Sequence, residues 1–141
     1  MAISEHPTPG TILLCDFNQG FREPEMIKRR PVIVMSPKIG IRANLCTVVS
    51  LSTTPPQIKM SYHCKLEIDP PLPLPWGKGE NWVKGDMIYS VGFHRLDLIR
   101  LGKDRSGKRI YRFDILTGEQ MRAVRTCILR ALGMNSLTQH L

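Results

Sequence analysis

Short apolar runs alternate with polar segments rich in glycine and proline along most of the chain, a pattern that predicts β-strands joined by turns. Between Ser61 and Ile68, apolar and polar residues alternate strictly, as expected for a strand with one buried and one solvent-facing side. The other runs are dominated by branched aliphatic side chains. Together, the runs predict strands at residues 11–17, 31–35, 45–51, 61–68, 82–91 and 109–113.

Two segments between these strands carry strong turn signals. Residues 69–75 contain four prolines, which remove backbone donors and exclude a helix interior or a central strand. This segment is therefore predicted to form an extended loop. Residues 104–108 read Asp-Arg-Ser-Gly-Lys and predict a hairpin turn before the last strand.

The C-terminal part of the chain changes to a helical pattern. Thr117 followed by Gln120 has the sequence of a capping box, and Gly133 suits the end of a helix. The apolar residues between them recur at helical spacing, at Met121, Val124, Ile128 and Leu132. One amphipathic helix after several short strands predicts a mainly β fold, a small and strongly curved barrel closed by the C-terminal helix.

The chain is expected to form a single domain. Its 141 residues are enough for one hydrophobic core, and no internal repeat or long linker divides them. We place the domain at residues 8–134, with flexible termini at residues 1–7 and 135–141.

The charge of the chain is strongly positive, because it contains 20 Lys and Arg residues but only 12 Asp and Glu residues, which gives a net charge of +8. Such a surface attracts polyanions, of which nucleic acid is the commonest in a cell. A basic protein without such a partner has the same composition, so charge alone leaves both interpretations open.

Cysteine usage and hydropathy restrict the setting in which the protein works. Four cysteines are scattered through apolar runs without metal-ligand spacing, so we interpret them as reduced core thiols and expect no metal or cofactor. No apolar run approaches the roughly 18 residues of a membrane span. The N-terminus lacks a secretory pattern as well, and we predict a cytoplasmic protein without membrane contact.

Residues 28–37 join a cluster of charge to a strand. Lys28, Arg29 and Arg30 lead directly into Pro31 and a run of β-branched residues. A guanidinium held at the mouth of a sheet in this way can form paired hydrogen bonds to a phosphate. The alternative interpretation is a solvated charge beside an edge strand.

Three motifs follow one another in an order found in one protein family. A Pro-Gly turn with an apolar run ending in Asp-Phe occupies residues 9–17, and the Arg-Pro strand occupies residues 28–37. A third strand ending in hydroxyl residues occupies residues 48–54. In this order they resemble the PemK/MazF family of toxins from bacterial toxin–antitoxin systems, whose C-terminal helix corresponds to the segment after Thr117.

The resemblance implies an SH3-like barrel that forms a homodimer, cleaves single-stranded RNA without a metal ion, and is silenced by a cognate antitoxin with an acidic segment. The family's catalytic Arg, immediately before Pro, falls on Arg30. Its catalytic Thr, at the end of the third strand, falls on Ser52 or on Thr53, and the sequence leaves this choice open.

These residues can also supply the groups that such a cleavage requires. Attack by the neighbouring 2′-hydroxyl requires a proton acceptor, a proton donor for the leaving 5′-oxygen, and positive charge at the transition state. Arg30 suits the positive charge, and Ser52 or Thr53 would orient the phosphate or the hydroxyl. Histidine is the natural proton acceptor near neutral pH, which makes His94 or His63 a candidate base. The resemblance places no base at either position, and the alternative interpretation is a surface histidine.

Six further residues are predicted to contact RNA, two by aromatic stacking and four by charge or hydrogen bonding. They are Lys28, Arg29, Trp76, Trp82, His94 and Arg95. The tryptophans could equally anchor the proline-rich loop. Two other functions stay open, a non-enzymatic inhibitor of similar fold such as the CcdB-type gyrase poison, and a nucleic-acid-binding barrel without catalysis. The Arg-Pro strand and the hydroxyls favour the ribonuclease, because a protein-binding poison needs neither.

Overall fold

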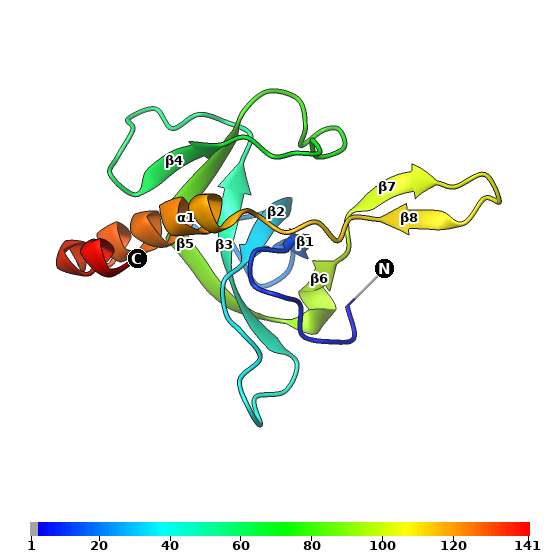
Figure 1. Ribbon diagram of the computed structural model, residues 1–141, viewed down its shortest axis with the longest axis horizontal. Helices are drawn as coiled ribbons and strands as arrows, with labels where there is room; N and C mark the ends of the chain where they lie inside the picture. The colour runs from blue at the N-terminus through cyan, green and yellow to red at the C-terminus, as the bar shows by residue number, and fades with distance from the viewer. Residues whose placement is uncertain (1–2) are drawn as a thin grey trace.

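The computed structural model describes residues 3–141 and shows an antiparallel sheet of six strands, a separate two-stranded hairpin and a C-terminal α-helix (Figure 1). The sheet contains β1 (Ile12–Asp16), β2 (Arg29–Val34), β3 (Leu45–Ser52), β4 (His63–Leu66), β5 (Asn81–Gly92) and β6 (Leu96–Asp97). The hairpin consists of β7 (Arg100–Lys103) and β8 (Arg109–Tyr111). The helical segments are η1 (Phe93–Arg95), α1 (Gly118–Ala131) and η2 (Asn135–His140).

The six-stranded sheet is curved and has two edges. Its strand order is β4-β5-β3-β2-β1-β6, with antiparallel pairing throughout. Within residues 3–141, β4 and β6 do not pair with each other, so they form the edges of the sheet. The predicted mainly β fold with one C-terminal helix is confirmed, whereas the strand pairing does not confirm a closed barrel.

The longest strand, β5, is irregular in its middle. Its pairing with β3 shifts register just before Ser50, and residues 85–87 have no partner on β3. At Gly85, a Cβ atom would lie 2.7 Å from the Tyr62 oxygen and 2.8 Å from the backbone of Cys127. Only glycine therefore lets the start of β4 and the helix α1 approach β5 this closely.

Both faces of β1 are buried, which explains why its sequence is apolar throughout instead of alternating. Ile12 and Leu14 join one hydrophobic cluster, whereas Leu13 and Cys15 join the other. The helix α1 covers the first cluster with its buried residues Met121, Val124 and Cys127.

The capping box at the start of α1 is confirmed by two hydrogen bonds. The Gln120 N–H donates to the Thr117 hydroxyl at 3.1 Å, and the Thr117 N–H donates to the Gln120 side-chain oxygen at 3.0 Å. The helix ends at Ala131, and Gly133 follows with a left-handed φ of 74°. Leu132, which was expected on the buried stripe, is 59% exposed because the helix ends before it.

Several strand boundaries differ from those predicted. The alternating segment 61–68 contributes only the four residues of β4, and the last predicted strand ends at Tyr111, so that Phe113 lies exposed beyond it. The sequence did not indicate β6 or β7. The first has only two residues, and the second is largely exposed, so neither produces an alternating pattern.

The two terminal segments lie against or continue the folded domain. Ile3 donates its N–H to the Leu96 carbonyl at 3.2 Å, while Met1 and Ala2 lie outside the described residues. At the other end, residues 135–140 form η2 where a flexible terminus was predicted, and the Thr138 hydroxyl donates to the Asn135 carbonyl at 2.7 Å.

In the part of the chain that the structure describes, no helix is both long and apolar enough to cross a membrane. The same residues include no group of three or more His, Cys, Asp or Glu side chains placed to hold a metal ion. All four cysteines are free thiols, and three of them are buried.

Candidate functional site

An open cleft of about 440 Å³ lies where the start of β2, the end of β3, the start of β4 and the irregular part of β5 meet. These four chain segments are brought together by the sheet order and by the register shift in β5. The residues that line the cleft are Met26, Arg30, Ser52, Thr54, Tyr62, His63, Lys84, Asp86 and Met87. The cleft thus combines cations, hydroxyl groups, an imidazole, an aromatic ring and a carboxylate.

Arg30 is half-buried at the second position of β2, and its side chain is anchored at one nitrogen. Its Nε donates to the carbonyl oxygen of Ile27 at 3.1 Å. Among the described residues, no carboxylate forms an ion pair with this guanidinium. Its two terminal nitrogens therefore remain available for a paired contact with an anion in the cleft.

The structure separates the two hydroxyl residues between which the sequence could not choose. Ser52 is buried at the end of β3 and lines the cleft with Arg30, whereas Thr53 is not among the lining residues. The Ser52 hydroxyl accepts from the Thr54 N–H at 3.1 Å and donates to the Thr54 carbonyl at 3.3 Å. This turn presents Thr54, which the sequence analysis did not single out, at the rim of the same cleft.

His63 lies at the start of β4, and its ring is held in one tautomer. Its Nδ1 faces the backbone N–H of Met60 at 3.0 Å, and because the N–H is the donor, Nδ1 must be the acceptor. The neutral ring therefore carries its proton on Nε2. Burial is the largest cause that lowers the pKa of His63, and the positive charge of Lys84 lowers it further, while Asp86 opposes the shift.

The ring of His63 is thus a neutral hydrogen-bond donor rather than a free base. Its only lone pair is already used by Met60, so accepting a proton would break that hydrogen bond. The sequence-based suggestion of His63 as the proton acceptor is disfavoured by this geometry. Tyr62 packs edge-on against the imidazole, with ring centroids 4.6 Å apart, and adds an aromatic surface to the cleft.

The irregular segment of β5 supplies two opposite charges. Burial lowers the pKa of Lys84, and the nearby carboxylate of Asp86 partly opposes this effect. Asp86 is exposed and is the only carboxylate among the residues that line the cleft. An ammonium group with a lowered pKa beside an accessible carboxylate gives the cleft both a proton donor and a proton acceptor.

The cations next to Arg30 lie outside this cleft. Lys28 is exposed before β2, with a left-handed φ of 71°, and Arg29 faces the opposite side of the strand. The Arg29 guanidinium donates to the Asp97 carboxylate at 3.0 Å, which ties β2 to β6. The alternation of side chains along a strand explains why Arg29 turns away from the cleft, whereas Lys28 precedes the strand and has a left-handed backbone.

His94 and Arg95 belong to a different place on the surface. Together with Asp16 and Gln19 they line a separate small hollow. The guanidinium of Arg95 donates to the Asp16 carbonyl at 3.0 Å and lies 4.9 Å from the centroid of the Phe21 ring. Arg95 therefore holds the loop between β1 and β2, and the structure does not bring it together with Arg30.

Neither tryptophan lines the cleft. Trp76 is half-buried and packs against the hydrophobic cluster beneath the proline-rich loop. Trp82 lies opposite Ser52 in the β3–β5 pairing, but its Nε1 donates to the Glu80 carboxylate at 2.8 Å. For Trp76, the anchoring role that the sequence left open agrees with this packing.

Besides Thr54, five residues of the cleft were not predicted from the sequence, namely Met26, Tyr62, Lys84, Asp86 and Met87. One signal was present, because Gly85 interrupts an otherwise regular strand, and a glycine inside a strand often marks a bulge. The adjoining charges at positions 84 and 86 would then have been candidates for a site.

Comparison with known proteins shows that residues 8–132 match the model of the PemK-like, MazF-like toxins of type II toxin–antitoxin systems. The chain belongs to this family. The match spans the Arg-Pro strand, the cleft and the C-terminal helix, so the resemblance noted from the sequence motifs is confirmed.

Two relatives show the extent of the sequence likeness. An uncharacterized protein of Haemophilus influenzae is 32% identical over 149 aligned positions, covering 97% of this chain and 98% of the relative. The protein YifN of Escherichia coli K12 is 33% identical over 118 aligned positions, covering 71% of this chain and 78% of the relative.

Solved toxin structures share the fold of this PemK/MazF-like chain. An endoribonuclease in complex with its cognate antitoxin from a mycobacterial species has a TM-score of 0.60 at 20% identity, over 92% of this chain and 97% of the other. MazF from Deinococcus radiodurans has a TM-score of 0.58 at 18% identity, over 93% of this chain and 100% of the other. At these identities the likeness concerns the fold alone.

Proposed function

We propose that the protein is a toxin that acts as a metal-independent, sequence-selective endoribonuclease on single-stranded RNA. The observation that carries the proposal is the cleft of a PemK/MazF-family chain in which Arg30 keeps two free guanidinium nitrogens beside Ser52, His63 and Asp86. Family membership supports the toxin role, and the polar groups of the cleft support phosphodiester chemistry.

The proposed reaction uses the 2′-hydroxyl of the RNA as the nucleophile. Its oxygen attacks the adjacent phosphorus, and its proton passes to the carboxylate of Asp86. The bond from phosphorus to the 5′-oxygen breaks, and the leaving oxygen takes a proton from Lys84, whose lowered pKa makes it the better acid. The products are a 2′,3′-cyclic phosphate and a 5′-hydroxyl.

The remaining groups stabilise charge on the phosphate. Arg30 forks onto two non-bridging oxygens and stays protonated throughout, because a guanidinium releases its proton very reluctantly. The Nε2–H of His63 is a neutral donor in the cleft, and the hydroxyl of Ser52 becomes a second one when it exchanges its bond to the Thr54 carbonyl for one to the phosphate. Tyr62 offers a face on which an unpaired base can stack.

The expected partners follow from charge and family. An antitoxin with an acidic segment would compete with RNA for a chain of net charge +8, and we propose that the active toxin is a cytoplasmic homodimer. One solved structure of the same fold is an endoribonuclease with its cognate antitoxin, which supports an interaction of this kind.

The test is incubation of the purified protein with a long single-stranded RNA in excess EDTA, followed by mapping of the product ends. Discrete cuts with 2′,3′-cyclic phosphate ends, lost in Arg30→Ala and retained in the surface control Arg122→Ala, are expected. Equal cutting by Arg30→Ala would reject the assignment of Arg30. A folded protein that arrests growth but cuts no RNA would instead point to a protein-binding poison.

A further inference from the structure

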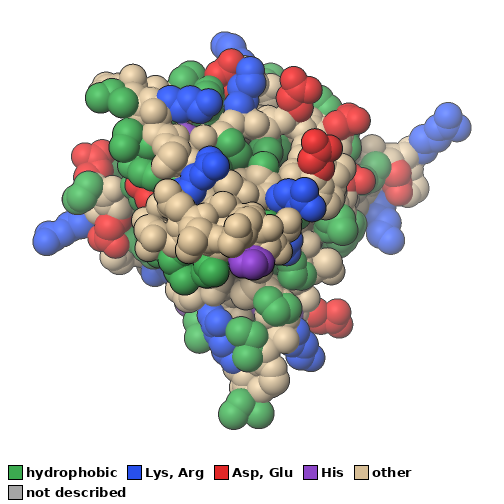
Figure 2. Space-filling model, turned by 60° about the vertical axis from the view of Figure 1, so that its left-hand side comes forward, with side chains coloured by type: hydrophobic (Ala, Val, Ile, Leu, Met, Phe, Trp, Pro, Cys, Tyr) green, Lys and Arg blue, Asp and Glu red, His purple; other side chains and the backbone are tan. Residues whose placement is uncertain are grey.

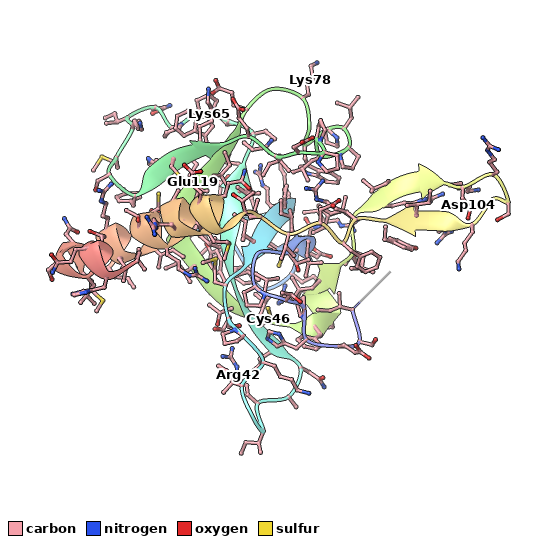
Figure 3. The ribbon with its side chains drawn as sticks, in the orientation of Figure 1. Arg42, Cys46, Lys65, Lys78, Asp104 and Glu119 are labelled. Carbon is pink, nitrogen blue, oxygen red and sulfur yellow. The ribbon has the colours of Figure 1, made fainter. Side chains whose placement is uncertain are left out.

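The hairpin β7–β8 extends away from the sheet, on the side opposite the C-terminal end of α1 (Figure 1). Figure 3 places Asp104 at its outer end, remote from Lys65 on β4 and Glu119 on α1. None of its residues lines the cleft around Arg30. We propose that this hairpin is a second RNA-binding surface, which holds the phosphate backbone of single-stranded RNA outside the cleft.

The hairpin carries a concentrated positive charge. The ten residues from 100 to 109 contain five cations and one carboxylate, a net charge of +4 and half of the chain's +8. All five cations are exposed, at Arg100, Lys103, Arg105, Lys108 and Arg109. A charge this dense on a projecting ribbon favours binding to a polyanion.

The carboxylate of the hairpin, Asp104, accepts hydrogen bonds from its own turn. Its Oδ1 accepts from the Ser106 N–H at 2.9 Å, from the Ser106 hydroxyl at 2.7 Å and from the Lys108 N–H at 2.9 Å. The ion pairs found among residues 3–141 join Arg29 to Asp97 and Lys65 to Glu80, and neither involves a hairpin cation. The five cations are therefore available to phosphate groups.

The pairing of the hairpin places like charges face to face. Lys103 lies directly opposite Arg109, and Arg100 lies opposite Tyr111, so that all four side chains emerge on one face. Like charges opposite each other destabilise a strand pair, and an anion bound between them removes the repulsion. The arrangement thus combines three cations with one half-buried aromatic ring, a combination suited to a phosphate backbone and an unpaired base.

The face that carries the end of α1 is less polarised than the hairpin. Figure 2 shows Lys and Arg side chains interspersed with Asp and Glu over the face that carries the end of α1. A β-ribbon also fits the major groove of duplex DNA, so duplex DNA is the competing ligand. We choose single-stranded RNA as the ligand because this inference rests on the proposed ribonuclease function. A long RNA substrate extends beyond the few nucleotides in the cleft, and the hairpin would hold that part.

The test measures binding without cleavage, using the intact protein and a 2′-O-methyl RNA of about 30 nucleotides, which exceeds the site size of a single small domain. The variant Arg100→Gln, Lys103→Gln, Arg109→Gln removes the cations of the paired face. Its RNA affinity is expected to fall at least about tenfold at low salt. The slope of log K against log salt should become shallower by about 2, since each contact with a single strand contributes about 0.7.

The matched control removes three arginines from the exposed face of α1, as Arg122→Gln, Arg125→Gln, Arg130→Gln. It has the same net charge as the hairpin variant, and its slope is expected to stay close to that of the unaltered protein. Equal losses in both variants would overturn the proposal, because they would reflect net charge alone. Unchanged RNA binding by the hairpin variant, or a loss confined to duplex DNA, would overturn it as well.

A second variant separates loss of RNA binding from loss of folding. Arg109→Glu places a negative charge opposite Lys103, so the hairpin should become no less stable while its RNA affinity falls. Thermal unfolding of each variant accompanies the binding measurement. A protein that cuts no RNA but loses RNA binding on hairpin substitution would reject the ribonuclease proposal and keep the hairpin. RNA cleavage together with unchanged RNA binding by the hairpin variant would keep the ribonuclease proposal and reject the hairpin as an RNA-binding surface.

Discussion

The Nδ1 atom of His63 accepts a hydrogen bond from the backbone N–H of Met60 at 3.0 Å, and this contact fixes the proton of the neutral ring on Nε2. Together with burial and the charge of Lys84, which lower the pKa of His63, it makes the imidazole a neutral donor at neutral pH. The role of the ring is therefore set by a backbone group three residues away.

The first prediction concerns the titration of His63. Its pKa in the folded protein should lie below the ordinary value of about 6.5, as read from the chemical shift of its ring protons. Because the unfolded chain then binds the proton more readily, the stability that His63 contributes is fully present above the unfolded pKa. It is lost as the pH falls from there to the folded pKa.

Urea unfolding between pH 5 and 8, compared with His63→Gln, measures this part of the stability, and the variant should show a smaller loss toward acid. A folded pKa at or above about 6.5 would contradict the assigned tautomer and its surroundings.

The second prediction concerns the proton acceptor. Asp86→Asn keeps the shape of the side chain in the cleft but cannot take the proton of the 2′-hydroxyl. RNA cleavage should slow by about 10²- to 10⁴-fold, the usual contribution of a general base, with RNA affinity little changed. Asp114→Asn, an exposed carboxylate outside the cleft, is the control. A rate within a few-fold of the unaltered protein would remove Asp86 from the mechanism.

The third prediction concerns the close approach at Gly85. A methyl group there would lie under 3.0 Å from the backbone of both Tyr62 and Cys127, and neither can move without displacing β4 or α1. Gly85→Ala should lower the free energy of unfolding by about 1–3 kcal/mol, as overpacking does. Gly118→Ala is the matched control, since a Cβ there meets nothing within 4 Å. Equal unfolding midpoints for the two variants would refute this account of the β5 irregularity.

The fourth prediction concerns thiol reactivity. A hydrogen bond from Cys127 is the largest cause that lowers the pKa of Cys64, and Lys59 lowers it further, while burial opposes the shift. Burial raises the pKa of Cys15 to about 12 and that of Cys46 above its ordinary value. Half-buried Cys64 should therefore be alkylated first near pH 8, because the thiolate is the reactive form.

Mass spectrometry of the partly alkylated native protein, with Cys64→Ser as the control, locates the first modification. Labelling of Cys15 or Cys46 ahead of Cys64 in the folded protein would show that the order of the thiol pKa values is wrong.

Local features of the sequence predicted much of the fold. The apolar runs of β1, β2 and β3 and the capping box at Thr117 depend on neighbouring residues, so they could be recognised without the fold. The Arg-Pro motif predicted the family for the same reason. Strand ends were less predictable, because the exposed hairpin strand β7 and the two-residue strand β6 have no periodic pattern.

The composition of the cleft was decided by the tertiary structure. Ser52, His63 and Asp86 lie on three strands, and they share the cleft with Arg30 because β5 shifts register where Gly85 lets α1 approach. No local pattern specifies which side chains a register shift brings together, since it is set by packing between distant segments. For the same reason the sequence placed His94 and Arg95 at the site, whereas the fold uses Arg95 to hold a loop. Local sequence was enough to indicate the longer strands, the C-terminal helix and the family, whereas packing across the sheet determined which residues meet.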